Sequence, residues 1–120
     1  MTLNTNKPIY LQIAEGLEDD VQAGRYPSDS RLPSVRDTAA NSQVNVNTVM
    51  RAYEHLEREG IIYNRRGIGY FVSADAGERI LAARKEQFFA DEMRYFFSRL
   101  SQIGIAPDEL RQLYASYLEK

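Results

Sequence analysis

The hydrophobic period of the chain changes near Gly60, and this change limits the folds available to its first half. Before Gly60, apolar residues recur at helical spacing in three successive segments. After it, two β-prone runs enclose a glycine-containing hairpin tip. The expected helical segments are 8–23, 34–40 and 45–59, and the β-prone runs are 61–63 and 70–72. Three helices followed by a β-hairpin form the element order of a winged helix-turn-helix, which we therefore predict here.

Each predicted helix has one inward apolar face. Ser34 and Asp37 have the spacing of a capping box at the start of the second helix, and Asn45 or Asn47 is expected to cap the third. The expected inward residues are Ile9, Ile13, Leu17 and Val21, then Val35, Ala39 and Ala40, then Val49, Ala52, Tyr53 and Leu56. The side of the first helix opposite its apolar face is expected to be solvated and acidic, with Glu15, Glu18 and Asp19. Between the first two helices, a segment rich in Pro and Ser is interpreted as a connector.

A boundary is expected at 75–77, where a turn-like Asp-Ala-Gly stretch follows the second β-prone run. Residues 1–75 are predicted to form the winged helix-turn-helix domain and residues 76–120 a helical dimerisation segment. A long helix should run to about Gln102, and after a glycine break a last helix should start at Pro107. The predicted fold class is therefore mostly α, with one small β-hairpin.

The long helix carries a wide apolar face. Five of its residues follow a 4-3-4-3 spacing, which is the seam of a helix that packs against another helix. One interpretation is an intramolecular core closed by the last helix. However, about 45 residues in two helices are too few to bury so wide a face alone, and a two-fold dimer is the commonest alternative. The predicted homodimer interface consists of Phe88, Phe89, Met93, Phe96, Phe97, Leu100 and Ile103.

Composition excludes several classes of function. The 120 residues include no cysteine and one histidine, which excludes disulfide scaffolds and thiolate or multi-histidine metal sites, so we expect no metal and no cofactor. Neither a signal peptide nor the roughly 18 apolar residues of a membrane span is recognisable, so we expect a cytoplasmic protein without a membrane partner. A Gly-rich phosphate loop, a nucleophile elbow and a paired histidine and acid are also missing, so an enzyme is not expected.

The net charge of −2, taken alone, argues against nucleic acid as a partner. The distribution of charge changes this interpretation. Residues 1–30 carry two basic and five acidic side chains, whereas residues 31–66 carry six arginines and four acids. A locally basic binding face on an acidic body is therefore compatible with double-stranded DNA.

The start of the third helix offers side chains suited to reading bases. A helix-turn-helix places the N-terminal end of its second helix in the major groove, where amide and guanidinium groups match the base edges. The alternative is that the two asparagines only cap the helix and that Thr48 is an ordinary surface residue. Arg51 faces outward, one turn after Asn47. The predicted base-reading residues are Asn45, Asn47, Thr48 and Arg51.

Phosphate contacts are expected from the first turn of the second helix. Arg36 would bind a backbone phosphate and set the register on DNA, and Ser34 would add a hydroxyl or a backbone amide at the helix N-terminus. The alternative for Arg36 is a local pair with Asp37 or a solvated charge.

The hairpin tip is the third predicted DNA contact. Arg65 and Arg66 lead into it, and positive charge there reaches phosphates or an adjacent minor groove. Gly67 and Gly69 permit the positive φ values of a tight turn. The alternative is an ordinary hairpin with exposed arginines.

Residues 9–73 resemble the DNA-binding domain of the GntR family of bacterial regulators. The resemblance rests on three stretches, which are IYLQIAEGLEDDVQAGRY, then RLPSVRDTAA, then VNVNTVMRAYEHLEREGIIYNRRGIGYFV. The last stretch is similar to the YtrA-like subfamily, whose short C-terminal helical pair matches the length and character of residues 76–120. The resemblance implies a dimeric regulator, usually a repressor, on a palindromic operator. It also implies DNA contacts by the LPSxR arginine at Arg36, by the recognition-helix residues given above and by the wing glycines Gly67 and Gly69.

Two positions depart from the family pattern. Val46 replaces the proline of an N-P-N start, and Ile68 replaces a wing lysine. The change at Ile68 removes a charge that faces DNA, so we expect the helix to contribute more than the wing. No dedicated small-molecule effector domain is expected, because larger members of the family need well over a hundred further residues for one.

Two classes of function compete on this sequence. The favoured one is a sequence-specific DNA-binding regulator that acts as a homodimer, with half-sites about 10 base pairs apart or a multiple of that spacing. The alternative is a winged helix used as a protein-interaction module without specific DNA binding. The acidic net charge keeps this alternative open.

Overall fold

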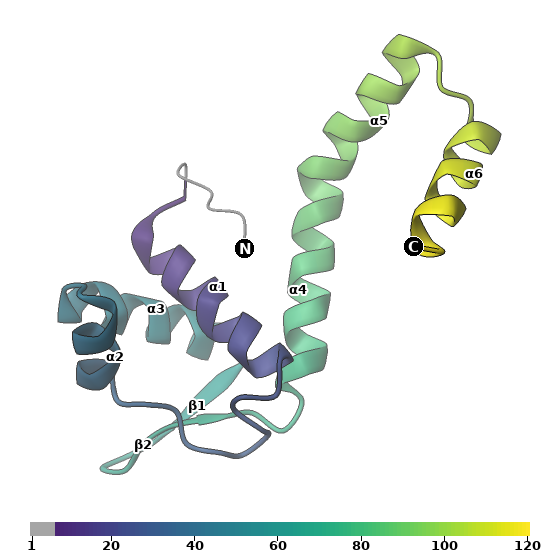
Figure 1. Ribbon diagram of the computed structural model, residues 1–120. Coiled ribbons are helices and arrows are strands. Elements are labelled where there is room, and N and C mark those ends of the chain that lie inside the picture. Colours follow the sequence, from purple (N-terminus) through teal and green to yellow (C-terminus); the bar gives the residue numbers. More distant parts are fainter. Residues whose placement is uncertain (1–6) are drawn as a thin grey trace. The chain divides into compact units, whose positions relative to one another are not determined.

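A computed structural model describes residues 7–120, which form two compact units, one ending at Ala82 and the other beginning at Ala83. The first unit contains α1 (Ile9–Gln22), α2 (Val35–Ser42), α3 (Val46–Arg58), β1 (Ile62–Arg65), β2 (Gly69–Val72) and the start of α4 (Ala76–Ala90) (Figure 1). The second unit contains the rest of α4, then α5 (Glu92–Ile103) and α6 (Pro107–Leu118). The mostly helical winged helix-turn-helix predicted from the sequence is thereby confirmed. Within residues 7–120, no helix is both long and apolar enough to span a membrane.

The core of the first unit is built around α3. All four residues predicted to face inward from this helix are at most 1% exposed, which confirms that prediction. Apolar side chains from the neighbouring elements complete the core: Ala14, Leu17, Leu32, Val35, Ala39, Ile61, Ile62, Val72, Ala76 and Ile80. Because Ala76 and Ile80 belong to α4, the first turns of this helix are part of the same core. The functional domain boundary near residue 75 stays a prediction.

The inward faces of α1 and α2 differ from the predicted ones at several positions. Ile9 is 58% exposed, whereas Glu18, predicted to be solvated, is only 8% exposed. The buried face of α1 is therefore rotated toward Ala14 and Glu18. In α2 the inward position belongs to Thr38 rather than to Ala40. Thr38 tolerates burial because its hydroxyl has a hydrogen-bond partner inside the unit.

The segment interpreted as a connector also pairs with the β-hairpin. β1 and β2 are antiparallel, with Ile62 opposite Val72. The 29–32 segment lies along the other edge of β2, where Leu32 N–H donates to the Tyr70 carbonyl at 2.9 Å and Val72 N–H donates to the Ser30 carbonyl at 3.0 Å. Leu32 is buried at this edge. Between Tyr70 and Val72, β2 is therefore hydrogen-bonded along both of its edges.

The long helix predicted up to about Gln102 is interrupted once. Asp91 has φ −112° and ψ −69°, which separates α4 from α5, although its N–H still donates to the Gln87 carbonyl at 3.1 Å. Gly104 ends α5 with φ 78°, and α6 starts at Pro107, as predicted. Neither α5 nor α6 contains a buried residue. The second unit therefore lacks a closed core within the described chain.

Candidate nucleic-acid interface

The N-terminal end of α3 is open to solvent and capped by its own asparagine. Asn45 precedes the helix, and its side-chain oxygen accepts a hydrogen bond from the Asn47 N–H at 2.7 Å. Gln43 makes the turn from α2 with φ 55°. Asn45 and Asn47 are exposed and Thr48 is half-buried. The cap engages the side-chain oxygen of Asn45 and the backbone N–H of Asn47. The side chain of Asn47 is not part of the cap and stays available to a partner.

Arg51 projects from α3 one turn further along and lies against α1. Its guanidinium carbon is 4.1 Å from the centroid of the Tyr10 ring, a cation–π distance. The Tyr10 ring in turn meets His55 edge to face, with 6.2 Å between ring centroids. Arg51 is nevertheless exposed. The aromatic support restricts the side chain and leaves its guanidinium donors at the surface.

The start of α2 lies in the same unit and presents a second polar group. The Ser34 hydroxyl accepts from the Asp37 N–H at 3.0 Å, which confirms the predicted cap. Arg36, in the first turn, is exposed. The Ser34 hydroxyl accepts in the cap and keeps its own proton. This hydroxyl, the backbone amides of the turn and the Arg36 side chain can therefore all donate to an anion.

A buried tyrosine holds the beginning of α2 against α3. The Tyr53 hydroxyl donates to the Pro33 carbonyl at 2.8 Å and lies 2.8 Å from the Thr38 hydroxyl. Because Tyr53 has one proton to give, Thr38 is the donor in the second hydrogen bond. Burial raises the pKa of Tyr53 above its ordinary value. The spacing between Arg36 and the start of α3 therefore depends on this side chain.

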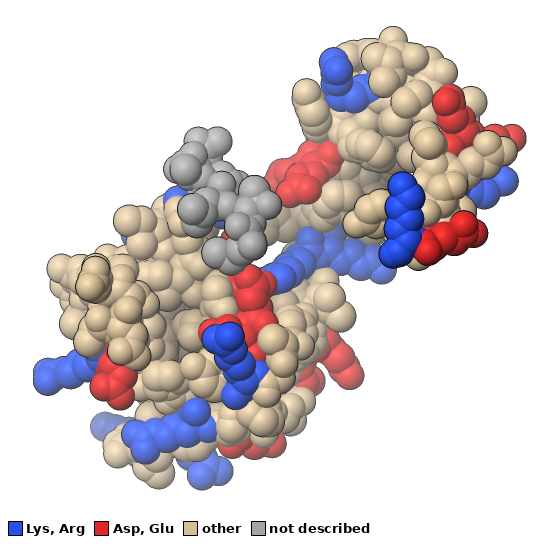
Figure 2. Space-filling view, viewed as in Figure 1, with Lys and Arg blue, Asp and Glu red and all other residues tan. Residues whose placement is uncertain are grey.

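The hairpin tip carries the predicted wing residues at the surface. The guanidinium of Arg65 lies 5.2 Å from the centroid of the Phe71 ring, and Phe71 stacks on Tyr63. Arg66 and Gly67 are exposed, and Gly67 has φ 79°, the left-handed turn conformation that glycine favours. Ile68, at the tip, is also exposed. Figure 2 shows basic side chains along the edge of this unit where Figure 1 draws the hairpin.

Arg31 is a candidate interface residue that was not predicted from the sequence. Its Nη2 donates to the Ile68 carbonyl at the wing tip. Gly69 has φ 146°, and a Cβ built there would lie 3.0 Å from Nε of Arg31. The absence of a side chain at Gly69 therefore lets Arg31 lie across the wing. No local pattern signals this contact, since its two residues are 37 positions apart.

The predicted dimer face lies in the second unit and is open. Phe88, Phe89, Phe96, Phe97 and Ile103 are between 40% and 61% exposed. Met93 and Leu100 are half-buried. An apolar groove of about 830 Å³ runs between α5 and α6. Within the described chain, α6 thus does not close an intramolecular core over this face.

Comparisons with known proteins agree with this arrangement. The family model "Bacterial regulatory proteins, gntR family" matches residues 9–72, from the start of α1 to the end of β2. The uncharacterized HTH-type transcriptional regulator YhcF of Bacillus subtilis (strain 168) is 31% identical over 96% of this chain and 93% of its own length. The HTH-type transcriptional repressor YtrA of the same strain is 32% identical over 90% of this chain and 82% of its own. A crystal structure from Bacteroides thetaiotaomicron, assigned to the same class of regulators, has a TM-score of 0.85 and 44% identity, covering 93% of this chain and 97% of that one.

Proposed function

Because the chain belongs to the gntR family of bacterial regulatory proteins and is a DNA-binding transcriptional regulator, we propose that it represses transcription as a homodimer bound to a palindromic operator. Members of the family are regulators rather than enzymes. The observation that carries the proposal is the two-sided character of α3. One side of this helix is fully buried, while Asn45, Asn47 and Arg51 on its other side are exposed. A rigid helix with a free polar face is what base reading in a major groove requires.

We propose that the first half of α3 reads the bases. Asn47 and Arg51 present an amide and a guanidinium, which match adenine and guanine edges respectively. The position of Arg51 on Tyr10 supports this role, since a side chain ordered before binding loses less conformational entropy on DNA. The proposed base-reading residues are Asn45, Asn47, Thr48 and Arg51.

The remaining DNA contacts are proposed at the backbone. Arg36 binds a phosphate at the start of α2, together with the backbone amides that follow Ser34. Arg65 and Arg66 bind phosphates or the minor groove beside the wing. The exposure of the three arginine side chains supports this arrangement. The proposed wing contacts also include Gly67 and Gly69.

We propose that residues 1–75 bind DNA and that residues 76–120 form the dimer. The support is the exposed apolar face of the second unit, which the described chain itself leaves uncovered. Each protomer then places one α3 in the major groove, and half-sites lie about 10 base pairs apart or a multiple of that. The proposed dimer residues are Phe88, Phe89, Met93, Phe96, Phe97, Leu100 and Ile103.

Selection of bound duplexes from a random DNA pool tests operator symmetry and sequence specificity together. We expect an inverted repeat, and a recovered pool without sequence preference would contradict the proposal. On the selected site, Arg51→Ala should lower affinity by about 1–3 kcal/mol, with a much smaller loss on unrelated DNA. Arg58→Ala is the matched control, because Arg58 is an exposed arginine two turns further along α3. Equal losses on both kinds of DNA would argue against base reading by Arg51.

A reporter experiment tests the sign of regulation. The selected operator is placed over a promoter, and expression is compared with and without this chain. Repression predicts lower expression with the chain present, because the bound dimer occludes polymerase. The similarity to the transcriptional repressor YtrA supports this sign. Higher expression would show an activator instead.

A further inference from the structure

We propose that two copies of this chain pair through antiparallel α5 helices, with Glu92 of each copy opposite Arg99 of the partner subunit. This inference rests on the proposed homodimer and adds the orientation and the register of its two chains. It assigns a pairing role to two charged residues outside the apolar interface described above.

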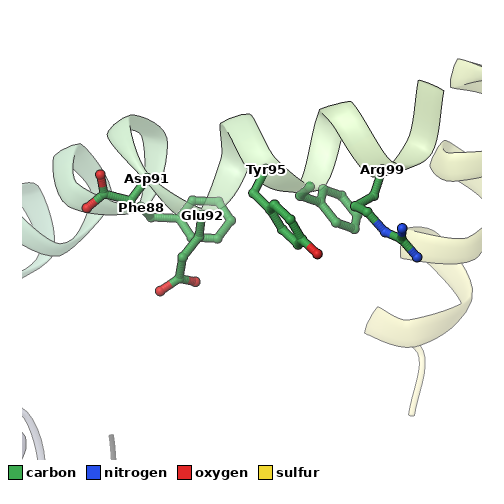
Figure 3. A pocket seen from close by; sticks show the side chains of 6 residues that line it. Phe88, Asp91, Glu92, Tyr95 and Arg99 are labelled. Carbon is green, nitrogen blue, oxygen red and sulfur yellow. The ribbon is translucent and has the colours of Figure 1, made fainter. Parts of the chain in front are cut away.

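The charges lie at opposite ends of one open recess. The recess has a volume of about 680 Å³ and is lined by Phe88, Asp91, Glu92, Tyr95, Phe96 and Arg99. In Figure 3, Glu92, Tyr95 and Arg99 project from the same side of the helix, and the tyrosine lies between the two charges. One end of the recess is therefore acidic, the other is basic, and its middle is aromatic.

Within the described chain, neither Glu92 nor Arg99 has an ion-pair partner. The two residues are seven positions apart on α5, which corresponds to about 10 Å along the helix axis. This separation is too long for a direct ion pair between them. Both charges are therefore free to meet a complementary charge on a second molecule.

A second copy supplies that complement only in one orientation. In a two-fold pair, the same patch meets itself. If the axis crosses α5 near Tyr95, the acidic end of each recess lies over the basic end of the other. If the helices run parallel, Glu92 and Arg99 face Phe97 and Gly104 of the partner subunit, which carry no charge. Opposite charges therefore favour the antiparallel pair.

The apolar seam on the neighbouring side of α5 is compatible with the same register. Met93 and Leu100 occupy the a positions of the heptad and Phe96 a d position, so Glu92 and Arg99 both occupy g positions. In an antiparallel pair, the g positions of both helices flank one edge of the seam. If Met93 packs against Phe96 of the partner subunit, Glu92 lies opposite Arg99 of the partner subunit on that edge.

Charge reversal in the full-length chain tests the register by sedimentation at low ionic strength. Glu92→Arg and Arg99→Glu should each weaken dimerisation about tenfold, because each replaces two attractive pairs per dimer with two repulsive ones. The double variant Glu92→Arg/Arg99→Glu should dimerise like the original chain. An equimolar mixture of the two single variants should form the heterodimer preferentially, since both of its pairs are again opposite in sign. Native mass spectrometry resolves the heterodimer by mass.

Arg94→Glu is the matched control, because it changes the charge as Arg99→Glu does but lies on another side of α5. It should dimerise like the original chain, and circular dichroism should show unchanged helix content in every variant. If the original chain dimerises and both single variants match it, the register is wrong while the homodimer stands. If the original chain sediments as a monomer at all concentrations, the homodimer and the register are both wrong.

Discussion

Replacing Tyr53 with phenylalanine tests the link between the two helices of the helix-turn-helix. The ring is fully buried and its hydroxyl joins α3 to Pro33, two residues before α2. Phenylalanine keeps the ring and its edge-to-face contact with Tyr70. Only the hydroxyl is lost, so the Pro33 carbonyl and the Thr38 hydroxyl lose a partner together.

The expected loss of unfolding free energy follows from these two bonds. A hydrogen bond contributes about 1 kcal/mol net, and a buried polar group left without a partner costs about 1–3 kcal/mol. Thr38 is buried, whereas Pro33 is half-buried and water reaches its carbonyl more easily. We therefore expect Tyr53→Phe to cost about 2–3 kcal/mol, most of it from Thr38. In a unit of this size, such a loss lowers Tm by about 10 °C or more.

Urea unfolding followed by circular dichroism measures this loss. Thr38→Val completes a double-mutant cycle, because it removes the second partner of the same hydroxyl. The double variant Tyr53→Phe/Thr38→Val should be more stable than the sum of the single losses predicts, since it leaves only the Pro33 carbonyl unpaired. A loss below about 0.5 kcal/mol for Tyr53→Phe would refute the view that this hydroxyl couples α2 to α3.

Three further predictions concern the wing and alkaline pH. Arg31→Ala should leave stability nearly unchanged but weaken operator binding roughly fivefold. The freed wing tip must then be ordered on binding, which lowers the binding free energy by about 1 kcal/mol. Titration of labelled operator measures this, and unchanged affinity would exclude a role for Arg31. Gly69→Ala should speed amide exchange at the wing tip, since its Cβ would displace the Arg31 side chain; unchanged exchange would contradict this. Burial raises the pKa of Tyr53 and Tyr70, so the native state keeps protons that the unfolded chain loses near pH 10. The free energy of unfolding should therefore keep its maximum value below that pH and decrease above it. The decrease should be smaller in the Tyr53→Phe variant.

Helix positions followed from residues that lie close together in the chain. The Ser34 cap, the Gly104 stop and the Pro107 start act within one turn, so their spacing alone indicated where helices begin and end. The prediction of the inward face of α3 was also correct, because its apolar residues are strictly periodic. The Asp91 break was missed, since neither proline nor glycine marks it.

The candidate DNA surface was only partly predictable. Its arginines and asparagines are recognisable in the sequence by type and position. The residues that hold these side chains in place are not recognisable there. Arg51 rests on Tyr10 of α1, and Arg31 spans to the wing. Both contacts depend on how elements distant in the sequence lie side by side.

Apart from the break between α4 and α5, the sequence by itself determined the order of helices and strands, the caps, the polar start of α3 and the apolar seam, because these depend on period and on neighbours within a few residues. Only the tertiary structure decided that Glu18 is buried, that Tyr53 holds Pro33 and that the 29–32 segment pairs with β2. The physical reason is that burial and long-range hydrogen bonds arise when whole elements pack, and packing selects which face of each helix turns inward.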